Sequence, residues 1–204
     1  GFGVRVDFLV AFTFAHGCWE WPTWRVVRDI VKPATMGGRC RYATLPSVRQ
    51  YFGEATVFMS HAWGAGWGSL VLAARLGASP TRHVWIDRFA VRQWPGNAAD
   101  LDFRGVIRGC VALVIASPVV SRIATTSIEW RTQHKDLKSL LDKLDSDMKG
   151  VLFPFRLWCI VEIHAAIAYG LHIIVRAGNA TCIREDGVIT GVLNNTENAA
   201  QMLE

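Results

Sequence analysis

The chain has 204 residues, of which 51% are hydrophobic and 19% charged, and its formal net charge is +5 at pH 7. This composition can fill a core, so it excludes an intrinsically disordered chain, and the length suits one α/β domain with additions. The basic residues form no dense run along the chain, so we expect no nucleic-acid partner.

Residues 1–53 are predicted to form an N-terminal extension that packs on the domain, because a regular alternation of strands and helices begins only after it. Within the extension, residues 23–31 have a helical pattern, with Pro22 near the start and Pro33 beyond the end. A second short helix is predicted over 47–52. The chain begins with glycine rather than methionine, so we expect a processed chain or a segment of a longer one.

Residues 54–176 alternate apolar, β-prone runs with helical segments, which predicts an α/β domain. Continuous apolar strands joined by helices are typical of a parallel sheet covered on both faces, and so of a doubly wound fold. The predicted strands are 55–60, 83–87, 111–117 and 173–175, and the predicted helices are 69–76, 101–109 and 155–169.

A helical insertion is predicted within this domain, over residues 119–154. Its amphipathic part carries Trp130, Leu137 and Leu144 at intervals of seven, which form a narrow apolar seam beside a charged face. The seam can pack on the domain's own core, or it can bind a partner helix or a second copy of the chain. Residues 177–204 are treated as a C-terminal segment.

Polar residues lie where the predicted strands end, at the edge of the sheet where ligands of such folds bind. Ser60 and His61 end the first strand, and Asp87 ends the second. We expect these three side chains to converge, with His61 either contacting a ligand or capping the neighbouring loop. Arg88 follows Asp87 directly and, with Arg92, is a local candidate for binding a phosphate, although a surface role is equally open.

The loop after the first strand has two further features of interest. Glycines at 64, 66 and 68 could bring backbone amides to a phosphate, but the segment matches no phosphate-loop motif, so a turn is favoured. Trp63, together with Trp67 and Trp94, could stack on a base. In a domain this rich in tryptophan, most indoles are expected to serve the core or an interface.

Glu162 is the only formally charged residue between Leu157 and Val175. A carboxylate is rarely buried unless something pairs with it or needs it. Trp158 precedes Glu162 by four residues, so on a helix the indole and the carboxylate lie on one face. The pair could hold a sugar or a nucleotide. The alternatives are that Glu162 is a buried structural acid paired with an arginine, or lies at the helix surface facing the insertion, and that Trp158 is a core residue.

The five cysteines are scattered, and none of their spacings fits a zinc site. We expect no bound metal and reduced, mostly buried thiols in an intracellular, cytoplasmic protein. The apolar run at 157–175 is long enough to cross a bilayer, but Glu162 and Gly170 interrupt it. A buried helix followed by a strand is therefore predicted, and no membrane span.

The ordered motifs resemble those of Toll/interleukin-1 receptor (TIR) domains, nearest to the plant-type and protist members. Thr56-Val-Phe-Met-Ser-His-Ala-Trp63 is similar to their first strand and following loop, and His83-Val-Trp-Ile-Asp87 to their second strand. Trp158-Cys-Ile-Val-Glu162 is similar to the Trp-Cys-Leu-x-Glu motif of the plant type. The first-strand segment departs from the plant type at His61, where plant members usually have Phe. The resemblance covers about 56–175 and implies a flavodoxin-like fold.

In catalytic TIR domains the glutamate of that motif is required for cleaving the nicotinamide–ribose bond of NAD. The resemblance therefore implies that Glu162 is the essential acid of an NAD glycohydrolase, with NAD as substrate and no required cofactor. The side chains expected to contact the ligand are Ser60, His61, Trp63, Asp87, Arg88 and Trp158.

Two other functions remain open from the sequence. Many TIR domains act by self-association, so the alternative is a non-catalytic interaction module that binds a second copy or a protein partner. A third hypothesis is a sensor whose pocket binds a nucleotide without turnover.

Overall fold

The computed structural model describes residues 1–117, 157–177, 183–185 and 188–190. The predicted insertion at 119–154, with its seam of Trp130, Leu137 and Leu144, lies outside these ranges, as does most of the C-terminal segment. Among the described residues, no helix combines the length and the apolar character needed to cross a membrane.

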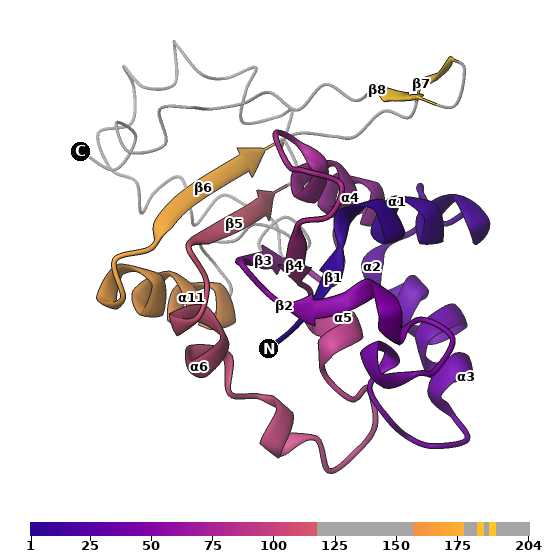
Figure 1. Cartoon of the computed structure of the whole chain (residues 1–204), viewed down its shortest axis with the longest axis horizontal. Coiled ribbons are helices and arrows are strands. Elements are labelled where there is room, and N and C mark those ends of the chain that lie inside the picture. The colour runs from indigo at the N-terminus through magenta and orange to yellow at the C-terminus, as the bar shows by residue number, and fades with distance from the viewer. Residues whose placement is uncertain (118–156, 178–182, 186–187, 191–204) are drawn as a thin grey trace, which may run out of the picture.

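Within the described ranges, the centre of the fold is a six-stranded mixed sheet in the order β2-β1-β4-β3-β5-β6 (Figure 1). The strands β4, β3, β5 and β6 are parallel to one another, and β1 pairs antiparallel with both β4 and β2. The bounds are β1 (Phe2–Arg5), β2 (Phe52–Glu54), β3 (Val57–His61), β4 (His83–Trp85), β5 (Ala112–Ser117) and β6 (His172–Ala177).

The parallel part of the sheet confirms the predicted α/β class. Across the sheet its four strands lie in the order β4-β3-β5-β6, so the first of them in the chain lies between the second and the third. This is the strand order of flavodoxin-like sheets. The expectation of a wholly parallel sheet is wrong, because residues 1–53 contribute β1 and β2 to the sheet itself. Both strands are short and have no long alternating pattern, so the sequence offers little sign of them.

Helices cover both faces of the sheet. One face carries α1 (Val6–Ala15) and α4 (Trp67–Arg75), and the other carries α6 (Phe103–Arg108) and α11 (Leu157–Ala168). Alternation along β3 divides the core between them, because Val57 and Met59 belong to the α1–α4 side and Phe58 to the other. On that second side the rings of Phe58 and Trp85 stack with their centroids 4.4 Å apart.

The helical segment near the N-terminus does not stop before Pro33, as the sequence predicted. It runs as α2 (Thr23–Val26), a π-helical turn (Val27–Val31) and α3 (Lys32–Thr35). In a regular α-helix the proline ring would crowd the carbonyl four residues earlier, which is that of Asp29. The wider π turn contains Asp29, and it allows the chain to remain helical through the proline.

The remaining elements are short. The predicted helix at 47–52 is only a 3₁₀ turn that leads into β2, and Asp87 opens a helical turn instead of ending β4. After α11, Gly170 adopts a φ of 69°, which confirms it as the expected helix stop. The short elements of the described ranges are the 3₁₀ turns Tyr42–Thr44, Arg49–Tyr51 and Ala98–Asp100, helix α5 (Asp87–Ala90), and the hairpin of β7 (Ile183–Glu185) and β8 (Val188–Thr190).

Candidate functional site

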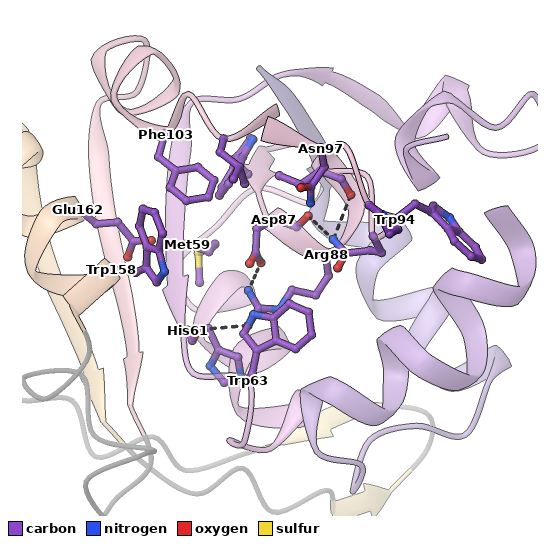
Figure 2. A pocket seen from close by; sticks show the side chains of 15 residues that line it. Met59, His61, Trp63, Asp87, Arg88, Trp94, Asn97, Phe103, Trp158 and Glu162 are labelled. Atoms are coloured by element: carbon purple, nitrogen blue, oxygen red, sulfur yellow. Dashed lines mark hydrogen bonds and ion pairs between the residues drawn. The ribbon is translucent and has the colours of Figure 1, made fainter. Parts of the chain in front are cut away.

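A cavity of about 470 Å³ lies beyond the carboxyl ends of β3 and β4. Its size falls within the range of small-molecule sites. Figure 2 shows side chains of α11 on one side of it and those of the strand ends on the other. Six of the seven residues expected at a ligand site line it, namely His61, Trp63, Asp87, Arg88, Trp158 and Glu162.

Ser60 is the exception, and its expected convergence with His61 and Asp87 is wrong. Neighbouring residues of a strand point to opposite faces, so Ser60 turns away from the cavity that His61 lines. Ser60 is buried under α11, where its hydroxyl donates to the Cys159 sulfur at 3.3 Å. This arrangement also removes any Ser–His–Asp hydrolase triad.

Helix α11 presents Glu162 and Trp158 to the cavity together, as their spacing predicted (Figure 2). Glu162 is 9% exposed, whereas Trp158 is 53% exposed and forms part of the rim. The Trp158 ring packs edge-to-face on Phe103 of α6, with centroids 5.5 Å apart. The carboxylate is therefore held in a largely desolvated wall beside a fixed aromatic surface.

Opposite α11, Arg88 joins the ends of β3 and β4. It forms an ion pair with Asp87, donates from Nη2 to the His61 carbonyl at 3.2 Å, and lies under the Trp63 ring at 4.8 Å. The Arg88 side chain is 4% exposed and that of Asp87 is 24% exposed. Arg88 therefore has a structural role in this wall, and Asp87 is the more accessible of the two charges.

The imidazole of His61 is buried and held between two partners. Its Nε2 lies 2.8 Å from the Thr23 hydroxyl, and its Nδ1 lies 3.4 Å from the Ala116 carbonyl. The Thr23 hydroxyl donates its single proton to the Ala65 carbonyl at 3.0 Å, so it accepts from Nε2 in the shorter of the two His61 contacts. His61 thus anchors α2 to the end of β3 as well as lining the cavity.

A third wall comes from the loop that follows α5, and it is organised by Asp100. The Asp100 carboxylate accepts from Arg92 Nε at 2.8 Å and from the Arg92 amide at 3.0 Å, and it forms an ion pair with Arg41. Burial alone would raise the pKa of Asp100, but the bonds from Arg41 and Arg92 outweigh it and lower the pKa to about 2. Arg92 is therefore committed to Asp100 and is not free to bind a phosphate.

We expect Asp100→Asn to lower the free energy of unfolding at neutral pH by about 1–3 kcal/mol, because two charged hydrogen-bond partners lose their carboxylate. The folded-state pKa lies below the usual value of about 3.9, so this stabilisation is present above that pH and is lost as the pH falls toward about 2. Urea unfolding should show that the difference in free energy of unfolding between variant and wild type becomes smaller as the pH falls from about 5 to about 3. Asp102→Asn is the control, since asparagine caps α6 equally well.

The loop between β3 and α4 is braced by an N-terminal segment and does not form a phosphate loop. The amides of Trp67 and Gly68, at the start of α4, donate to the carbonyls of Trp21 and Trp19 at 2.8 and 3.0 Å. These amides are unavailable to a phosphate, so the structure supports the turn. Trp67 itself is fully buried in the core and does not line the cavity.

We expect Gly68→Ala to destabilise the fold by about 1–3 kcal/mol through overpacking. An added methyl at this position would lie 2.7 Å from the Trp19 ring and 2.9 Å from its carbonyl oxygen. Gly66→Ala is the matched control, because its methyl would meet only Ser69, at 3.7 Å. A thermal melt that ranks the two variants equally would contradict this close contact.

Several lining residues were not anticipated from the sequence. Met59 lies two positions before His61 and Trp85 two before Asp87, so strand alternation could have identified both. Phe103 and Asn97 reach the cavity only through the packing of α6 and of the loop before it, for which the sequence gives no local signal.

The described ranges contain four of the five cysteines together with many of the acidic side chains. There, no group of three or more His, Cys, Asp or Glu side chains is arranged to hold a metal ion. Cys18, Cys110 and Cys159 are buried, and Cys40 is partly exposed. Burial raises the pKa of the Cys18 thiol to about 12 and that of Cys110 to about 11, which makes them poor nucleophiles.

Comparison with known proteins found no matching family model, no matching curated protein and no matching solved structure.

Proposed function

We propose that the cavity binds NAD and that the protein hydrolyses its nicotinamide–ribose bond with Glu162 as the essential acid. One observation carries the proposal. Glu162, the only charged residue of an apolar run in the sequence, lies in the wall of an open cavity. It is four residues from the exposed Trp158 and lies across from two strand ends. Asp87 and Glu162 give this cavity a carboxylate on each side.

The chemistry needs few groups. When the bond between the ribose C1′ and the nicotinamide nitrogen breaks, the electron pair returns to the pyridinium ring, which leaves as neutral nicotinamide. Positive charge develops on C1′ and the ring oxygen of the ribose. A carboxylate held beside that centre stabilises it more strongly in a desolvated wall than in water. Water then attacks C1′ and loses a proton, which gives ADP-ribose.

The aromatic walls of the cavity suit both the binding of the substrate and the release of the product. Trp158 and Phe103 provide flat apolar surfaces for a nicotinamide ring. The pyridinium of NAD is a cation, and an indole face attracts it before cleavage but not after it becomes neutral. Product nicotinamide is therefore held less tightly than substrate.

An open cavity supports a ligand-binding function over a purely structural module. A module that acts only by self-association has no need for an accessible cavity at the carboxyl ends of its strands.

The test is to incubate the purified chain at high concentration with NAD and to quantify nicotinamide and ADP-ribose by chromatography. Equimolar release of both products is the expected result. Thermal stabilisation by NAD without release would instead support a sensor. The absence of both product release and thermal stabilisation would overturn the proposal.

A further inference from the structure

The fold gathers tryptophans and cations that are scattered in the sequence. In the described part of the chain, four indoles that lie on or near the α2–α3 segment each have a cation over the ring. The pairs are Arg25 on Trp21 at 4.1 Å, Arg28 on Trp24 at 4.9 Å, Arg88 on Trp63 at 4.8 Å, and Lys32 and Arg39 on Trp94 at 5.3 and 5.8 Å. We call the outward-facing part, formed by Trp24, Trp63, Arg25, Arg28, Lys32 and Arg39, the tryptophan–cation surface.

Two indoles of this surface are exposed, and their backbones are in contact. Trp24 is 42% exposed and Trp63 is 40% exposed. The Trp24 amide donates to the Trp63 carbonyl at 3.0 Å, which fixes the two residues as neighbours although they are far apart in sequence. Each ring has a guanidinium near it, and the exposed remainder of each indole is open to a flat partner.

The charges of the surface are only partly balanced. Arg25 and Arg28 share one carboxylate, that of Asp29. Among the residues that the structure describes, Lys32 and Arg39 form no ion pair at all. The indole of Trp94, on which both cations lie, is fixed by a bond from its Nε1 to the Thr35 hydroxyl at 3.0 Å. Trp94 lines the cavity, whereas Lys32 and Arg39 do not, so these two cations lie beside the cavity and not within it.

From these observations we infer, contrary to the expectation from the sequence, that the tryptophan–cation surface binds single-stranded nucleic acid. Unbalanced cations attract a chain of phosphates, and exposed indoles stack on unpaired bases. An acidic peptide would satisfy the cations but would leave two flat aromatic faces without a matching group. The surface also reaches the candidate cavity, since Trp63 belongs to both. This inference goes beyond the proposed hydrolase and does not depend on it.

The test is fluorescence anisotropy of a labelled oligothymidine of about 15 nucleotides, titrated with the full chain at several salt concentrations. Trp24→Ala should weaken binding at least about fivefold, because one base no longer stacks on an indole. Lys32→Gln combined with Arg39→Gln should lower the slope of log K against log salt by about 1.4, at about 0.7 for each phosphate that is no longer neutralised. Glu162→Gln should bind as the wild type does.

Matched controls keep the result specific. Met36→Ala removes an exposed apolar side chain just after α3. Arg104→Gln with Arg108→Gln removes two exposed charges from α6, on the other side of the sheet. Neither should change affinity or salt slope. Three results would each overturn the inference. The first is equal affinity for an abasic oligonucleotide, and the second is unchanged binding by both Trp24→Ala and the milder Trp24→Leu. The third is binding only to phosphatidylserine vesicles or to polyglutamate.

Discussion

Glu162→Gln is expected to lower the rate of nicotinamide release by about 10²–10³-fold, the usual cost of removing one group that stabilises charge in a transition state. Glutamine keeps the shape of the side chain but removes the negative charge that faces the developing ribosyl cation. Because Glu162 is only 9% exposed, this charge acts in a poorly solvated wall where its effect is large. The rate is measured with saturating NAD, so that weaker binding does not imitate the loss.

Glu54→Gln is the control for this change, because Glu54 is an exposed glutamate on β2, at the far edge of the sheet. Its rate should equal that of the wild type. Both variants should melt within a few degrees of the wild type. A Glu162→Gln variant that retains full activity would rule out the assigned role of the carboxylate, whatever the cavity binds.

Arg88→Met is expected to lower the free energy of unfolding by about 3 kcal/mol, the range in which breaking a buried ion pair falls. The Arg88 side chain is 4% exposed, and it links Asp87, the His61 carbonyl and the Trp63 ring. Methionine fills much of the same space but leaves the Asp87 carboxylate without its cation. The measurement is urea unfolding at neutral pH.

Adding Asp87→Asn to Arg88→Met should recover part of this stability, because the unpaired carboxylate is then removed as well. Arg108→Met, on the exposed end of α6, should change the free energy of unfolding by no more than about 0.5 kcal/mol. A change as small as this in Arg88→Met would show that the two strand ends are held together by other contacts.

The elements that surround the cavity follow from strong local patterns. The apolar runs of β3 and β5 are buried in the sheet, so the sequence alone locates them. The apolar run of α11 also predicts its helix, but the expectation that this helix is buried is wrong, because Ile160 and Ile167 on its outer face are 50% and 65% exposed. The four-residue spacing of Trp158 and Glu162 correctly predicted that both side chains face one site. Local periodicity therefore accounts for most of the cavity's floor and for one of its walls.

The features that sequence reasoning missed depend on contacts between distant segments. Strand β1 is four residues long and is defined by its pairing with β4, about eighty positions later. The expected convergence of Ser60 with His61 fails because the last two residues of β3 point to opposite faces of the sheet. The positions of Arg92 and Thr23 are set by Asp100 and His61, and no local pattern links those pairs.

The most direct test of the proposed site is a crystal structure of the Glu162→Gln variant bound to NAD. The variant should bind the dinucleotide without cleaving it. We expect intact NAD in the cavity, with the nicotinamide ribose against residue 162 and the nicotinamide ring beside Trp158. NAD bound elsewhere on the molecule, or an empty cavity in crystals grown with saturating NAD, would contradict the proposed site.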